Sequence, residues 1–106
     1  MKQWDIFTWE FPGGSHPAVI VSHPMRVTNK DSVNVLYCTS QRAGRPPKEH
    51  EVLLDAADGL SWETLVRCDV LYLASKSELR QYRGTVIPER RRLIARRVFE
   101  SFGWSF

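Results

Sequence analysis

The sequence predicts a small α+β domain, in which a curled and mostly antiparallel β-sheet is packed against helices. Three observations lead to this class. The first two-thirds of the chain holds short apolar or alternating runs between Gly, Pro and polar turns, a pattern typical of strands. After Ala74 the apolar residues recur at helical spacing. With 106 residues, 1–106 is expected to be one domain built around one core.

Five strands are expected in the first part of the chain. They cover residues 4–11, 18–21, 33–38, 51–54 and 64–68. The first alternates and is rich in aromatics, and Pro12-Gly13-Gly14 ends it in a turn. The second and third are short and apolar, as buried strands are. Residues 28–32 are expected to form a loop, and residues 42–48, with two Pro among basic side chains, an exposed and mobile one.

Two helices are expected in the last third. Ser75-Lys76-Ser77-Glu78 fits a capping box, which predicts a short helix to about Tyr82 that Gly84 ends. Pro88 suits the first position of a second helix. Its apolar face would consist of Leu93, Ile94, Val98 and Phe102.

The opposite face of this second helix is strongly basic. It holds Arg90, Arg91, Arg92, Arg96 and Arg97. Such a row is either a solvated helix face or a surface that binds RNA phosphates, and the sequence leaves both open.

Composition narrows the class of protein. The net charge of +3 favours polyanionic partners without proving one. No apolar run approaches the roughly 20 residues that cross a bilayer, and Asp5 and Glu10 interrupt any signal-peptide core. Cys38 and Cys68 lack metal-ligand spacing and suit two small buried thiols in a reducing cytoplasm. A cytoplasmic protein without metal, cofactor or membrane contact is expected.

Arg67 and Asp69 are the first candidates for chemistry. They lie two residues apart at the end of an expected strand, so their side chains share one face. A permanent cation beside a possible base can act on a phosphodiester. The structural alternative is an ordinary ion pair at a strand end.

Two further stretches carry polar groups. His16 lies in a Gly-rich turn and could exchange protons at neutral pH, or simply face solvent. Thr39, Ser40, Gln41 and Arg42 follow the third strand. They are candidates for contacts with phosphate, or polar residues that close a strand. The sequence has no phosphate-binding P-loop and no nucleophile elbow, so acid–base chemistry on a phosphate is the easiest catalysis to build from it.

These stretches together resemble the MazF/PemK family of toxin endoribonucleases. Trp4-Asp5-Ile6-Phe7 is similar to the opening strand of that family, and the run from His16 to Ser22 to its Arg-Pro strand. Residues 33–41 resemble the strand that ends in Thr-Ser, and Arg67-Cys68-Asp69 matches the PemK/Kid form of the motif. Lys76, Leu79 and Arg83-Gly84 correspond to the linker helix and turn. The resemblance covers residues 4–99.

The resemblance implies a compact, SH3-like sheet barrel of the MazF/CcdB type with a C-terminal helix, working as a homodimer. It implies metal-independent cleavage of single-stranded mRNA, by attack of a 2′-hydroxyl, to a cyclic phosphate and a 5′-hydroxyl. It also implies a cognate antitoxin that threads an acidic or amphipathic tail across the dimer groove.

The resemblance also implies roles for single residues. Asp69 would be the general base, Arg67 the acid or the cation of the transition state, and Thr39 and Ser40 the ligands of the scissile phosphate. Because an arginine pKa exceeds roughly 12, we expect His16 to be the acid if it faces the same groove. His16 stands where most members have a phosphate-gripping arginine, and an imidazole lacks that bidentate grip.

Two other functions stay open at this stage. The missing arginine and the aromatic C-terminus also suit a gyrase poison of the CcdB type, which shares this fold and binds a protein target. An inactive paralogue that only binds RNA or an antitoxin is the third possibility.

Overall fold

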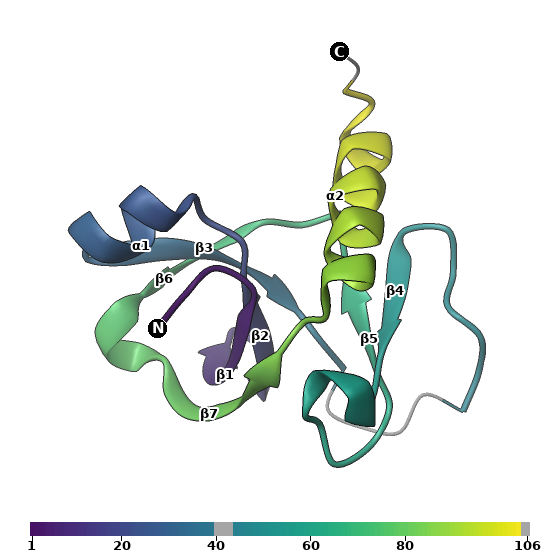
Figure 1. The fold of residues 1–106 in the computed structure, drawn as a ribbon, viewed down its shortest axis with the longest axis horizontal. Helices are drawn as coiled ribbons and strands as arrows, with labels where there is room; N and C mark the ends of the chain where they lie inside the picture. The colour runs from purple at the N-terminus through teal and green to yellow at the C-terminus, as the bar shows by residue number, and fades with distance from the viewer. Residues whose placement is uncertain (40–43, 105–106) are drawn as a thin grey trace.

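The chain forms two antiparallel sheets and a long C-terminal helix (Figure 1). The computed structural model describes residues 1–39 and 44–104. Its strands are β1 (Asp5–Phe11), β2 (Gly14–Ile20), β3 (Ser32–Tyr37), β4 (Glu51–Leu54), β5 (Thr64–Arg67), β6 (Tyr72–Ser75) and β7 (Arg80–Thr85). Its helices are α1 (Pro24–Asn29) and α2 (Pro88–Phe102), with single 3₁₀ turns η1 (Ala56–Asp58) and η2 (Lys76–Glu78).

The larger sheet has the strand order β6-β3-β2-β1-β7, and the smaller one pairs β4 with β5. The end of β3 joins them: the Cys38 amide donates to the Pro17 carbonyl, and Cys38 also bridges to Val66. In Figure 1 the larger sheet curls on one side, β4 and β5 stand on the other, and α2 rises beside them.

The expected barrel does not close within the described part of the chain, so that prediction was wrong. The edge strands β7 and β4 do not pair with each other. Instead η1, which follows β4, packs against β7 at Gly84. Gly84 has φ +156°, and a Cβ on it would overlap the Asp58 carbonyl oxygen. This close approach explains why the position is a glycine.

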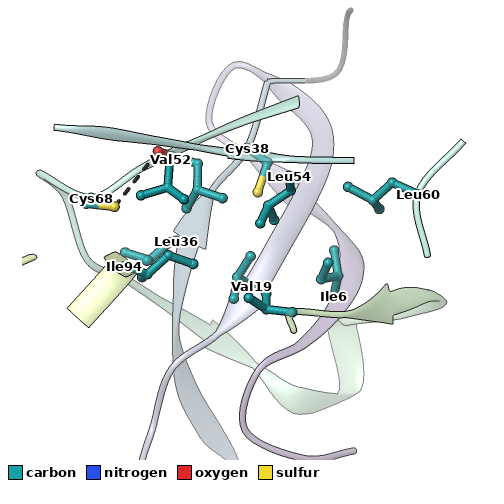
Figure 2. Close-up of a cluster of buried hydrophobic side chains, with 11 residues drawn as sticks. Ile6, Val19, Leu36, Cys38, Val52, Leu54, Leu60, Cys68 and Ile94 are labelled. Carbon is teal, nitrogen blue, oxygen red and sulfur yellow. Dashed lines mark hydrogen bonds between the residues drawn. The ribbon is translucent and has the colours of Figure 1, made fainter. Parts of the chain in front are cut away.

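One apolar core lies between the two sheets and α2 (Figure 2). Figure 2 shows Ile6, Val19 and Leu54 pointing into it from three strands, and Ile94 entering from α2 beside Leu36. A second cluster, centred on Phe11, Ile20 and Val35, fills the other face of the larger sheet. The two clusters follow from the alternation of side chains along β2 and β3.

The five expected strands are present, but β2 begins at Gly14, four residues before the expected start, so His16 lies in a strand and not in the expected turn. The sequence analysis also missed α1 and β6. Residues 28–32 were expected to be a loop, whereas Thr28 and Asn29 complete α1 and Ser32 begins β3. His23 starts α1, because its Nδ1 accepts from the Met25 amide at 3.0 Å. β6 was also missed; it pairs along β3 from Ser32 to Val35.

The helix expected from residue 75 to about 82 does not form. Ser75 makes no side-chain cap, η2 is one turn, and β7 follows at once. β7 pairs with the edge of β1 that β2 leaves free, at Asp5↔Thr85 and Ile6↔Gly84. These long-range sheet contacts outweigh a local capping signal, which is worth only about 1 kcal/mol.

The second expected helix is confirmed, with Pro88 in its first turn. Of its predicted apolar face, Ile94 is buried and Val98 packs on the core, while Leu93 and Phe102 are 37% and 40% exposed. The basic face is not simply solvated. Arg90 binds Asp55 and Asp58, and Arg91 donates to the Val86 carbonyl.

Both cysteines are free and buried in the core, as expected. Burial raises the pKa of the Cys38 thiol well above its ordinary value, and raises that of Cys68 to about 12. Both are therefore protonated and unreactive at neutral pH. Among the described residues, none of the helices has the length and apolar character needed to span a bilayer.

Candidate active site

Arg67 and Asp69 meet at the end of β5, as the sequence predicted. Nη2 of Arg67 lies 3.3 Å from Oδ2 of Asp69. The Arg67 side chain is 43% exposed and that of Asp69 is 31% exposed, so the pair is neither sealed in the core nor fully solvated. Arg67 Nε and Asp69 Oδ1 are buried and have no hydrogen-bond partner in the described part of the chain. Each residue therefore keeps one polar atom uncommitted.

His50, which the sequence analysis did not consider, lies beside the same carboxylate. Its Nε2 is 3.7 Å from Asp69 Oδ2. The β4–β5 ladder explains the placement: Glu51 pairs with Arg67, and the Cys68 amide donates to the His50 carbonyl at 2.9 Å. Residues just before β4 must then lie beside those just after β5. Pairing the expected strands 51–54 and 64–68 as a hairpin would have revealed His50.

Asp69 and His50 line a cavity of about 260 Å³. Glu49, Glu100 and Ser101 complete its lining, so the end of α2 forms one wall. Glu100 is in turn paired with Arg97, at 2.8 Å. The cavity therefore combines titratable groups from the residues just before β4, the residues just after β5, and α2.

An ion pair between the exposed Arg45 and the buried Glu51 fixes the start of β4 next to this cavity. The Glu51 side chain, 3% exposed, accepts two bonds from Arg45 at 2.7 and 2.9 Å and one from the Lys48 amide at 2.8 Å. The Arg45 hydrogen bonds are the main reason that the pKa of Glu51 falls from 4.5 to about 2. Residues 44–48 are exposed, as expected, but Arg45 is held in place by this pair.

His16 lies on β2 in an aromatic setting. Its ring centroid is 4.5 Å from that of Tyr37 and 6.1 Å from that of Phe11. Nε2 is 3.5 Å from the Tyr37 hydroxyl, and Nδ1 is buried without a partner among the described residues. Within that part of the chain, no hydrogen bond or ion pair joins His16 to Arg67 or Asp69.

Thr39 uses its hydroxyl at the junction of β3 and β5. Oγ1 accepts from the Leu65 amide at 3.1 Å and lies 2.9 Å from Oγ1 of Thr64, whose hydroxyl also reaches the Thr39 carbonyl. The Cys38 amide still bonds to the Pro17 carbonyl, whereas the Thr39 amide bonds to the Leu65 carbonyl, so Thr39 pairs with β5. The other predicted phosphate ligands, Ser40, Gln41 and Arg42, lie outside the described residues.

No three His, Cys, Asp or Glu side chains of residues 1–39 and 44–104 gather where they could hold a metal ion.

The family model for the PemK-like, MazF-like toxins of type II toxin–antitoxin systems matches residues 2–102. The chain belongs to this toxin family. No match was found among curated protein sequences.

Solved structures of MazF-type proteins share the fold of this PemK/MazF-like chain. An endoribonuclease from a mycobacterial species, solved in complex with its cognate antitoxin, is 22% identical with a TM-score of 0.85, covering 100% of this chain and 98% of its own. The Mycobacterium tuberculosis toxin MazF-mt6 is 20% identical with a TM-score of 0.82, covering 96% and 99%. A MazE–MazF structure from Deinococcus radiodurans is 20% identical with a TM-score of 0.75, covering 99% and 97%. At these identities the likeness concerns the fold.

Proposed function

We propose that this PemK/MazF-like toxin is an endoribonuclease that cleaves single-stranded mRNA without a metal ion. The observation that carries the proposal is the partly exposed Arg67–Asp69 pair, in which Asp69 lines a cavity beside His50. The family match and the similar endoribonuclease structures support the same reaction class.

Asp69 is the general base in this proposal. Its carboxylate takes the proton of a ribose 2′-hydroxyl, and the resulting oxygen attacks the adjacent phosphorus. Arg67 stabilises the negative charge that grows on the phosphorane oxygens, because a guanidinium stays charged throughout. The P–O5′ bond then breaks, leaving a 2′,3′-cyclic phosphate and a 5′-oxygen that needs a proton. That proton comes from a histidine, either His16 or His50.

The remaining predicted contacts belong to substrate binding. His16 on β2, Thr39 just after β3, and the stretch Ser40, Gln41 and Arg42 would hold the phosphates on either side of the cut. Two further proposals concern assembly. The protein works as a homodimer, and a cognate antitoxin silences it by laying an acidic or amphipathic segment across the dimer groove.

A digest of a long RNA in the presence of chelator tests the proposal. We expect short products with cyclic phosphate and 5′-hydroxyl ends from the wild type, and no cleavage from Asp69→Asn. Asp31→Asn is the matched control, because Asp31 is exposed and lies in the turn before β3. RNA that stays intact with the wild-type protein over many sequences would refute the proposal.

A gyrase poison is the second candidate. The C-terminal aromatics favour it, because Trp104 is 53% exposed and stacks on Phe102, also exposed, with ring centroids 4.9 Å apart. Exposed aromatic pairs of this kind anchor protein interfaces. Intact cellular RNA together with gyrase-linked DNA breaks would select this function. Binding of RNA or antitoxin without either effect would identify an inactive paralogue.

A further inference from the structure

His50 and Asp69 are held face to face by the backbone. The Cys68 amide bonds to the His50 carbonyl, and Glu51 pairs with Arg67 in the ladder. The His50 side chain takes no part in these bonds and is about one-third exposed, toward the cavity. Its imidazole is therefore positioned by the hairpin yet open to a ligand.

Asp69 uses its two oxygens differently. Oδ2 lies 3.3 Å from Arg67 Nη2 and 3.7 Å from His50 Nε2. Oδ1 is buried and has no partner in the described part of the chain. Because Oδ1 is enclosed, the oxygen that a substrate can reach is Oδ2, which lies between Arg67 and His50.

Charged groups surround His50 on every element that packs near it. They are Asp69 and Arg67 at the end of β5, Glu51 on β4, Glu49 before it, and Glu100 with its partner Arg97 on α2. Among the described residues, Asp69 is the one carboxylate within ion-pair distance of the imidazole.

The other histidine of the proposed site has a different environment. His16 packs against Tyr37 and Phe11, with one ring nitrogen near the Tyr37 hydroxyl and the other buried. Such surroundings suit a residue that holds a base or a phosphate in place. Among the described residues, no carboxylate forms an ion pair or hydrogen bond with His16.

We propose that His50 is the general acid of the RNA cleavage, an inference that rests on the proposed endoribonuclease function. As the 2′-oxygen loses its proton to the Asp69 carboxylate and bonds to phosphorus, the P–O5′ bond breaks. The leaving 5′-oxygen takes the proton from His50 Nε2. The imidazolium becomes neutral and the carboxylate becomes a carboxylic acid, so no net proton enters or leaves the pair.

Because Asp69 and His50 lie close together, a proton transfer between them can restore their starting protonation states. Asp69, now protonated, lies 3.7 Å from His50 Nε2 through Oδ2. A small side-chain rotation lets the proton pass from the carboxylic acid to the imidazole. The starting ion pair is restored without exchange with solvent.

A substrate with sulfur in place of the bridging 5′-oxygen distinguishes a general acid from a residue that binds or positions the RNA. A thiolate leaves without protonation, so the general acid becomes dispensable for that substrate alone. We expect His50→Gln to cleave normal RNA about a hundredfold or more slowly than wild type, and the sulfur-substituted RNA within about fivefold of it. We also expect the fall in rate at high pH, which reports the acid, to disappear in His50→Gln with normal RNA.

Three controls make the result specific. Affinity for a DNA oligonucleotide of the same sequence, which cannot be cut, should be unchanged in His50→Gln and proves that the variant is folded. Asp31→Asn alters an exposed side chain in the turn before β3, away from the cavity, and should cleave both substrates like wild type. His16→Gln should be slow on both, because its defect is in holding the substrate.

The inference is overturned if His50→Gln stays slow on the sulfur substrate, or if sulfur rescues His16→Gln instead. In both cases the wild type still cleaves RNA, so the proposed function stands. If the wild type cleaves neither substrate, the proposed function and this inference fail together.

Discussion

Arg67 acts in the proposed reaction through its shape as well as its charge. Its Nη2 is engaged by Asp69 while its Nε is uncommitted in the described chain. Lysine at this position would keep the charge but lose the planar set of donors that matches phosphate oxygens. We expect Arg67→Lys to lower kcat by about ten- to a hundredfold with a smaller change in KM. Single-turnover cleavage assays measure this, and an equal loss in Arg67→Ala and Arg67→Lys would show that donor geometry matters more than charge.

Glu51 gives the fold an acid-sensitive contact. Its pKa is about 2 in the folded chain and 4.5 ordinarily, so the unfolded chain binds more protons between these values. The stability that Glu51 contributes is therefore complete above about pH 4.5 and is lost as the pH falls toward 2. We expect Glu51→Gln to lower the free energy of unfolding at pH 7 by about 2 kcal/mol. Urea titrations from pH 3 to 7 should show the gap between the two proteins narrowing in acid; a gap that widens would contradict this.

Among single residues, the sequence predicted contacts between residues close in the chain and missed contacts that arise from the pairing of two strands. Arg67 and Asp69 lie two apart on one strand, so alternation alone brings their side chains together. His50 reaches Asp69 through the register of β4 and β5, which depends on contacts far apart in the sequence. His16 lies on β2 against Tyr37, because the strand extends further toward the turn than the apolar run of residues 18–21 indicates.

Among the elements, α2 is attached to the domain by a charged network at its first turn. Asp58 has no exposed side-chain surface and accepts from the Asp55 amide and the Ile87 amide, each at 3.0 Å, and from Arg90. The Arg90 guanidinium also lowers the pKa of Asp55. We expect Asp58→Asn to destabilise the fold by about 3 kcal/mol, because it leaves Arg90 without its buried partner. Thermal and denaturant unfolding measure this.

A surface pair on the same helix is the control for that prediction. Arg97 and Glu100 are 2.8 Å apart but well exposed. Glu100→Gln should therefore cost no more than about 0.5 kcal/mol. Similar losses in Asp58→Asn and Glu100→Gln would mean that the network at the start of α2 is not what holds the helix.

Elements were predictable where local chemistry and packing agree. Pro88 and the spacing of Ile94 and Val98 specify α2, which the structure confirms. The capping box at Ser75 pointed to a helix, but the free edge of β1 required a partner strand and β7 supplied it. β6 is short and contains the exposed Leu73, so it carries little apolar pattern of its own and forms because β3 offers an edge.

At the scale of the whole molecule, the fold class could be predicted from the sequence, but whether the sheet closes into a barrel could not. Alternating and apolar strands followed by a helix lead to an antiparallel α+β domain. Whether the sheet closes depends on how η1 meets β7, and there Gly84 allows backbone to pack on backbone instead of forming a ladder. Asp58 and Gly84 are far apart in the sequence, and the residues around each of them do not predict the contact.

The surface beside α2 carries the last prediction, the homodimer. A groove of about 410 Å³ runs between α2 and the larger sheet and is lined by apolar side chains such as Val21, Leu71 and Val98. Leu71 is 38% exposed there, and exposed apolar patches of this kind mark interaction surfaces. We expect the wild type to have twice the chain mass of 12.3 kDa in light scattering, and Leu71→Glu to shift it to the monomer. Met25→Glu is the matched control, because Met25 is 62% exposed on α1 and does not line the groove. A dimer that survives Leu71→Glu would place the interface elsewhere, and a monomeric wild type would refute the homodimer.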